Sequence, residues 1–92
     1  MIFYMECEFF IPSAHSLKEK RAVLKSMLTR SKQKFNVSAA EIDHQNVWQR
    51  TRIAFVTVAS SKEMAEKEMA QVLYYLESNP AWECLEYHQE YL

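Results

Sequence analysis

The first residues of the chain alternate between apolar and polar side chains, which is the pattern of a β-strand with one buried face. Over residues 2–11, one face carries Phe3, Met5, Cys7, Phe9 and Ile11, and the other carries Tyr4, Glu6 and Glu8. Pro12 follows and ends the strand, because proline has no N–H to donate to a neighbouring strand. The segment therefore predicts a strand that lines a core with one face only.

A first helix is predicted directly after this strand. Ser16 forms a Ser-x-x-Glu capping box with Glu19, which satisfies free N–H groups at a helix start. The apolar positions then recur at helical spacing through about residue 33, at Leu17, Val23, Leu24, Met27 and Leu28. Lys20 breaks the pattern, because it projects into the apolar sector near the first turn.

A second helix has the same kind of start. Ser60 and Glu63 predict another capping box. The apolar stripe that follows consists of Ala65, Met69, Val72, Leu73 and Leu76. An Asn-Pro pair at residues 79–80 ends this helix, because proline cannot continue it.

Three more strands complete the chain. They are predicted at residues 35–43, 51–59 and 82–91, with a turn at 44–49, and two adjacent alanines leave the register of the first of them open. The order strand, helix, strand, strand, helix, strand is typical of the ferredoxin-like split βαβ fold. We therefore predict an α+β protein with a four-stranded antiparallel sheet and two helices on one face, forming a single domain over residues 1–92.

Composition narrows the classes of function. Glycine is absent from all 92 residues, which excludes every phosphate-binding loop that depends on glycine. No apolar run approaches the roughly 20 residues of a membrane span, and residues 1–12 lack the basic start of a secretory signal. Two cysteines without such a signal predict reduced thiols in the cytoplasm.

The net charge of −1 conceals an uneven distribution. Residues 18–52 carry nine basic and three acidic side chains, a net of +6, and the rest of the chain carries −7. At about 100° per residue, one side of the first helix collects four cations over roughly 21 Å. This basic flank consists of Lys18, Arg21, Lys25 and Lys32. It is either a polyanion-binding surface or a solvated helix face, and the lack of acids on it favours the first.

The turn at residues 44–49 holds the next candidates. Trp48 either covers an edge of the core or stacks on a base or a partner, and His44 and Gln49 would join it in a partner contact. Arg50 and Arg52 alternate with Thr51, so both point to the same face of the third strand, where they would bind polyanions. The sequence leaves open whether these arginines and the basic flank form one surface.

Catalysis and metal binding have little support. Cys7 lies on the inner face of its strand as a structural thiol, near Cys84 if the first and last strands pair. Glu86, His88 and Glu90 share one strand face, but no fourth metal ligand is indicated. His15 and His44 have no evident acid, base or nucleophile partner. We predict no enzyme, no catalytic residue, no metal and no cofactor.

Several segments resemble the YlxP-like family of bacteria, a small family of unknown function. They are SLKEKR at 16–21, KFNVS at 34–38, AEIDHQ at 40–45 and WQR at 48–50. The resemblance runs essentially end to end and implies a ferredoxin-like fold in the bacterial cytoplasm. It also implies a gene neighbourhood of transcription and translation factors, often beside ribosome-binding factor A, and no established catalytic residues.

These observations predict a non-catalytic protein that binds RNA or a ribosomal subunit, in ribosome assembly, through the basic helix and the hairpin that follows. RNA stacking on the open face of the sheet is disfavoured, because Glu6 and Glu8 place acids there. The alternative is a protein-interaction module or a homodimer. It would use Ile2, Tyr4 and Phe10 on the open sheet face, together with the tyrosines of the last strand.

Overall fold

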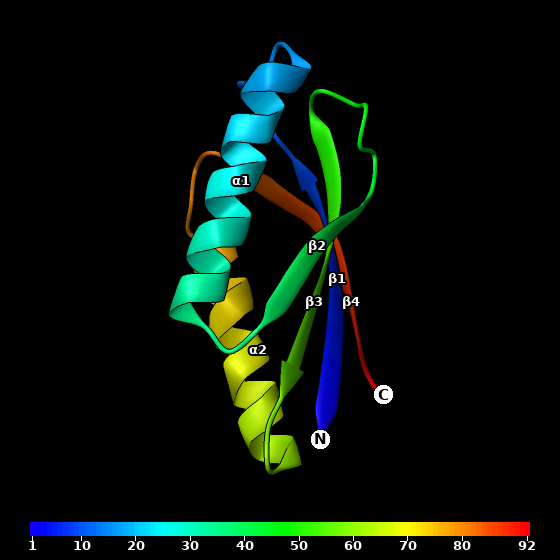
Figure 1. Ribbon diagram of the computed structural model, residues 1–92, viewed down its shortest axis with the longest axis vertical. Coiled ribbons are helices and arrows are strands. Elements are labelled where there is room, and N and C mark those ends of the chain that lie inside the picture. Colours follow the sequence, from blue (N-terminus) through cyan, green and yellow to red (C-terminus); the bar gives the residue numbers. More distant parts are fainter.

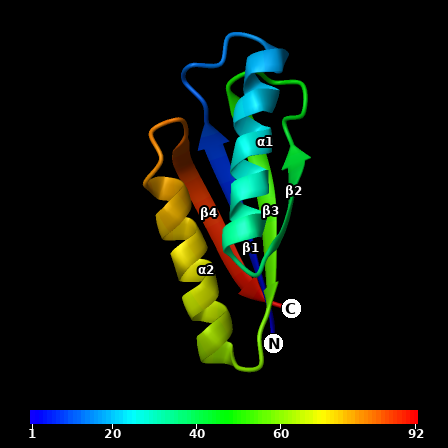
Figure 2. The ribbon, with the colours of Figure 1, turned by 60° about the vertical axis from the view of Figure 1, so that its left-hand side comes forward.

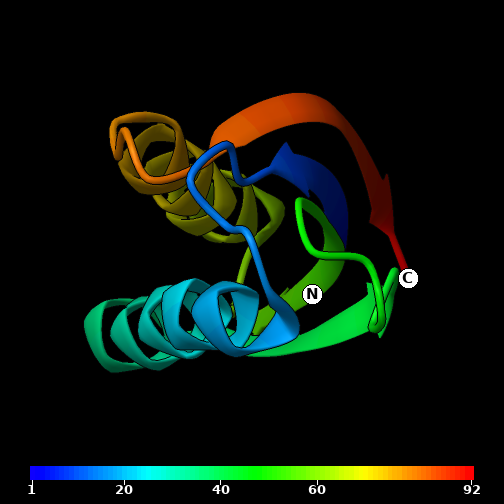
Figure 3. The ribbon, with the colours of Figure 1, turned by 90° about the horizontal axis from the view of Figure 1, so that it is seen from above.

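The computed structural model describes residues 1–92 and has the element order predicted from the sequence. The elements are β1 (Ile2–Phe10), α1 (Leu17–Lys34), β2 (Ser38–Asp43), β3 (Arg50–Val58), α2 (Lys62–Glu77) and β4 (Glu83–Tyr91). The strands form one antiparallel sheet in the order β2-β3-β1-β4, and both helices cover the same face of it (Figures 1 and 3). The ferredoxin-like α+β fold is confirmed.

The core lies between the helices and the inner rows of the two central strands. Each inner row alternates with an outer row that faces away from the helices, as the strand period of two requires. The buried apolar side chains of β1 and β3 are Phe3, Met5, Cys7, Phe9, Ile53 and Phe55. From the helices, Leu24, Met27, Ala65, Met69, Val72 and Leu76 pack against them. The apolar stripes predicted from helical spacing therefore supply the core.

Side chains cap both helices, although only one cap is the predicted one. Ser16 Oγ accepts from the Glu19 N–H at 3.1 Å, and the Glu19 carboxylate accepts from the His15 N–H at 3.0 Å. The second capping box was wrong, because Ser61 caps α2 by accepting from the Met64 N–H at 3.2 Å. Only Ser60 has a glutamate three residues later, whereas Met64 stands three residues after Ser61. Either serine can serve as an N-cap, and the chain path into the helix decides between them.

The structure shifts one strand boundary substantially. β2 begins at Ser38 and not at Phe35, because the Phe35 N–H still donates to the Ser31 carbonyl and closes α1. The register between β2 and β3 changes between Glu41 and Asp43, which marks a bulge at the end of β2.

The edges of the sheet are formed by β2 and β4, which each have a neighbour on one side only. In Figure 2, α1 lies beside β2 and in front of β3, and α2 lies beside β4. Neither helix is long and apolar enough to cross a lipid bilayer.

Candidate functional site

The basic flank of α1 is open to solvent along its length. All four of its side chains are exposed, and none of them takes part in an ion pair. The opposite side of α1 faces α2 and the loop that follows it, because Val23 and Arg30 line a hollow with Trp82, and Lys34 lies over the Tyr75 ring. The basic flank therefore faces away from α2, on the side of the sheet edge formed by β2.

A buried ion pair attaches the start of α1 to β2. Lys20, predicted to point inward, has no exposed surface, and its Nζ lies 2.9 Å from Glu41 Oε2. The Thr51 hydroxyl also donates to Glu41 Oε2, at 2.6 Å, and Lys20 Nζ donates to the His44 carbonyl. A buried ammonium requires such partners, because desolvation without them is costly. One lysine therefore connects the helix, the edge strand and the hairpin.

The hairpin between β2 and β3 is held at its base and exposed at its tip. His44 has a positive φ of 64°, which turns the chain where a glycine is common. Gln49 fixes the return through two bonds: its carbonyl accepts from the Ile11 N–H at 2.9 Å, and its Nε2 donates to the Pro12 carbonyl at 3.1 Å. At the tip, Val47 and Trp48 remain 43% and 53% exposed.

The sequence left two roles open for Trp48, covering the core or contacting a partner, and the structure gives the first of them to Trp82. Trp48 does not cover the core, so that interpretation was wrong. Trp82 does, because it is 5% exposed, its Nε1 donates to the Leu76 carbonyl at 2.6 Å, and its ring meets Phe9 edge to face. Of the three predicted contact residues of the hairpin, Trp48 is the most exposed and alone has no hydrogen bond or ion pair from its side chain, since His44 and Gln49 have polar partners.

An ion cluster occupies the outer face of the sheet at the hairpin end. Its centre is Glu8, which is only 5% exposed and is 2.9 Å from His44 Nε2, 3.1 Å from an Arg50 nitrogen and 3.2 Å from an Arg52 nitrogen. Arg52 also pairs with Glu6 at 2.8 Å and with Glu86 at 3.0 Å. The ion cluster thus spans strands β1, β3 and β4.

The cluster keeps the carboxylates of Glu6 and Glu8 ionised. Burial opposes the charge on Glu8, but hydrogen bonds from Arg50 and Arg52 outweigh burial and keep the pKa of Glu8 below its usual range. Hydrogen bonds from Tyr4 and then from Arg52 lower the pKa of Glu6. Burial and the bond to Glu6 raise the pKa of Tyr4 to about 12. Each charged side chain is stabilised by neighbours of opposite charge, so few of its hydrogen-bonding groups remain available to a ligand.

This arrangement corrects the idea of one basic surface. Arg50 and Arg52 lie on the outer sheet face, and the helices cover the other face, so the arginines and the basic flank are on different sides of the sheet. Arg52 contacts three carboxylates, which leaves it poorly available to a polyanion. The signal was present in the sequence: Glu6 and Glu8 alternate on one strand as Arg50 and Arg52 alternate on another.

A polar hollow of about 550 Å³ opens beside the ion cluster. It is lined by Glu8, Asp43, His44, Arg50, Arg52, Leu85 and Glu86. None of these side chains is a hydroxyl or thiol nucleophile, and no three His, Cys, Asp or Glu side chains of the protein are arranged to hold a metal. Glu86, His88 and Glu90 do share the outer face of β4, where His88 and Glu90 are 3.8 Å apart.

The two thiols are close to each other and are both free. Burial is the main cause that raises the pKa of Cys7, and the nearby Cys84 raises it further. Burial also raises the pKa of Cys84. Protonated thiols are poor nucleophiles and poor metal ligands.

The outer sheet face is less apolar than was expected for a surface that binds another protein or a second copy of the chain. The tyrosines of β4 were placed wrongly, because Tyr87 and Tyr91 pair with Cys7 and Phe3 in the inner row and point to the helix side. Ile2 and Val58, opposite each other in the register, are 42% and 59% exposed. Phe10, the third residue predicted for this patch, lies at the other end of the face opposite Arg50. The ion cluster therefore separates the apolar residues of this face, and they do not form one continuous patch.

Together these features define a small ferredoxin-like α+β domain with an unpaired cationic helix on one side and a self-neutralised ion cluster on the other. The family described as "Protein of unknown function (DUF503)" matches residues 2–89, and the chain belongs to this family. It is 52% identical over 80 residues to the "Uncharacterized protein YlxP" of Bacillus subtilis (strain 168), a match that covers 87% of each chain. The YlxP-like resemblance is confirmed.

Proposed function

We propose that this protein is a non-catalytic, cytoplasmic protein that binds RNA, as free RNA or within a ribosomal subunit, in ribosome assembly. One observation carries the proposal: the four cations of the basic flank are exposed and unpaired, whereas Lys20, Arg50 and Arg52 form ion pairs with carboxylates of the same chain. Two free thiols with raised pKa values suit a reducing compartment.

The basic flank is the proposed RNA contact because its cations are unpaired, whereas those of the ion cluster are paired. An exposed cation without a partner can neutralise a phosphate of RNA, which releases counterions condensed on the RNA. Four such contacts correspond to a slope of about −3 in log affinity against log salt. The paired arginines of the ion cluster would have to give up carboxylate partners first, so they are left out of the proposed contact.

The hairpin tip extends this surface. Lys20 bonds to the His44 carbonyl, which holds the hairpin against the first turn of α1, where Lys18 begins the basic flank. The start of α1 and the hairpin lie at the same end of the molecule (Figure 1). An exposed aromatic ring beside cations is the combination used to bind single-stranded or looped RNA. Trp48 is therefore assigned to stacking, at the end of the basic flank.

A charge-matched pair of double variants tests the proposal. Lys18→Glu/Lys25→Glu reverses two charges on the basic flank, and Arg30→Glu/Lys62→Glu reverses two elsewhere, so both change the net charge equally. Binding to ribosomal subunits and to structured RNA is measured across a salt series. We expect the flank variant to weaken binding and to reduce the salt slope by about 2, with a small effect of the control.

The outcomes separate the possibilities clearly. Equal weakening by both doubles would mean that overall charge and not the flank attracts RNA, and would refute the proposal. Absence of binding, or binding independent of salt, would refute it as well. Trp48→Phe should retain binding and Trp48→Ala should weaken it, because an aromatic ring of either kind can stack.

The second candidate function is self-association, and the exposure of Ile2 beside Val58 favours it. Apolar contacts of this kind give an association that salt does not weaken. Sedimentation of the free protein over a range of concentrations tests it. A monomer at every concentration would remove this candidate and leave RNA binding untouched.

A further inference from the structure

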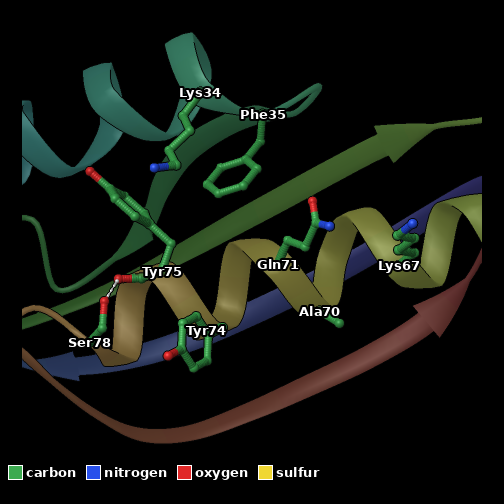
Figure 4. A pocket seen from close by; sticks show the side chains of 8 residues that line it. All are labelled: Lys34, Phe35, Lys67, Ala70, Gln71, Tyr74, Tyr75 and Ser78. Atoms are coloured by element: carbon green, nitrogen blue, oxygen red, sulfur yellow. Dashed lines mark hydrogen bonds between the residues drawn. The ribbon is translucent and has the colours of Figure 1, made fainter.

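A groove of about 570 Å³ lies between the end of α1 and the outer side of α2 (Figure 4). Its volume is within the range of small-molecule sites, about 300–1,000 Å³. α1 and the residue after it contribute Lys34 and Phe35, and α2 contributes side chains spaced by three or four residues along one face. The residues that α2 and its cap supply are Lys67, Ala70, Gln71, Tyr74, Tyr75 and Ser78.

Three aromatic rings make up much of the apolar lining. Phe35 and Tyr75 meet edge to face with centroids 5.5 Å apart, which fixes both rings. Lys34 Nζ lies 5.0 Å from the centre of the Tyr75 ring. Tyr74 is 78% exposed and has no hydrogen bond from its hydroxyl, so its ring is available to a ligand. An exposed aromatic ring of this kind is a platform on which a base can stack.

The charge on this aromatic groove has one sign. Lys34 and Lys67 line it, no carboxylate does, and neither lysine forms an ion pair. Figure 4 shows the two ammonium groups toward opposite ends, with the Gln71 amide between them. An amide in that position can both donate to and accept from the edge of a heterocycle. The lining thus suits a flat, polar-edged ring linked to negative charges.

We propose that the aromatic groove binds nucleotide units of single-stranded RNA, with a base stacked on Tyr74 and phosphates paired with Lys34 and Lys67. This inference rests on the proposed function and adds a second RNA contact, on the other side of α1 from the basic flank. The same chemistry occurs in a free nucleotide. The two lysines lie toward opposite ends of the groove, which favours a strand, because a strand presents a phosphate to each of them and AMP has only one.

Three probes distinguish these ligands: hexaadenylate RNA, AMP and inorganic phosphate. Each is titrated into the full-length protein by calorimetry, and backbone amide shifts are followed by NMR. We expect hexaadenylate to bind, with shifts concentrated at Gln71, Tyr74 and Tyr75, and phosphate alone to bind far more weakly. Equal binding of AMP and hexaadenylate would assign the groove to free nucleotides. Equal binding of phosphate would overturn the proposal, because the rings would then add nothing.

Conservative variants test the individual roles. Tyr74→Ala should weaken hexaadenylate binding by about fivefold or more and Tyr74→Phe should retain it, because stacking requires only the ring. Tyr87→Ala is the control, since Tyr87 is 53% exposed but lies outside the groove. Lys67→Gln should reduce the salt slope by about 1, with Lys62→Gln as its control on the same helix.

The two proposals fail separately. Undiminished hexaadenylate binding by Tyr74→Ala and Lys67→Gln would overturn the groove as a site, even if ribosomal RNA binding still depends on the basic flank. Binding at the groove combined with ribosomal RNA binding that ignores Lys18→Glu/Lys25→Glu would overturn the role of the flank alone.

Discussion

Glu41→Gln is expected to destabilise the protein strongly, although it replaces a carboxylate with an amide of the same shape. The variant leaves the Lys20 ammonium fully buried, with the amide oxygen and the His44 carbonyl as its neutral acceptors. Removing one partner of a buried ion pair costs about 3–5 kcal/mol. The remaining acceptors and the 14% exposure of the Glu41 side chain favour the lower end, about 3 kcal/mol.

That loss is large for a domain of this size. Stability of about 0.05–0.15 kcal/mol per residue gives about 5–14 kcal/mol in total. With a urea dependence of about 1–3 kcal/mol per molar, the midpoint of unfolding should fall by about 1–3 M. Urea titrations followed by circular dichroism at neutral pH measure this shift. Glu83→Gln, which changes an exposed carboxylate that forms no ion pair, should stay within about 0.5 kcal/mol of the parent protein.

A double variant isolates the cause. Lys20→Met/Glu41→Gln should be more stable than Glu41→Gln alone, because it removes the buried charge that has lost its partner. If Glu41→Gln unfolds at the same urea concentration as Glu83→Gln, the buried ion pair does not stabilise the attachment of α1 to β2. The reasoning would also be refuted if the double variant were the less stable of the two.

Two further predictions concern the ion cluster and the tryptophans. Because the pKa of Glu8 is lowered in the folded protein, its contribution to stability is complete above its ordinary pKa of 4.5 and is lost as the pH falls through the folded value. Glu8→Gln should therefore cost about 1–3 kcal/mol at pH 7, with the difference shrinking in acid, and a pH-independent difference in urea titrations would contradict this. Trp82→Ala should cost about 3–5 kcal/mol, whereas Trp48→Ala should change stability by about 0.5 kcal/mol or less, and equal effects on the thermal midpoint would show that burial does not separate them.

Features that depend on near neighbours in sequence were predictable. Alternation assigned the inner and outer rows of β1, helical spacing assigned the core faces of α1 and α2, and the Ser16 cap was found because a cap involves residues three apart. The inward direction of Lys20 followed from the same spacing. Helix and strand geometry repeats from residue to residue, so a local pattern is enough to define it.

The partners of the polar residues were not predictable in the same way. Alternation put Glu8 on the outer row and both arginines on one face, but only the register of β1 against β3 set Glu8 opposite Arg52 and turned a supposed binding surface into an ion cluster. The path of the chain after α2 likewise decided that Trp82 is buried while Trp48 is exposed.

One physical reason explains why the faces of helices and strands were predictable and the partners of polar residues were not. The local sequence sets which side chains each helix and strand presents to a given side, because that depends on backbone geometry over a few residues. The tertiary structure decided which charges meet, because an ion pair depends on contacts between residues far apart in the chain, such as Lys20 with Glu41 and Arg52 with Glu6. The cations of the basic flank form no ion pair, and neither do Lys34 and Lys67 of the aromatic groove, so both sets remain available to a partner.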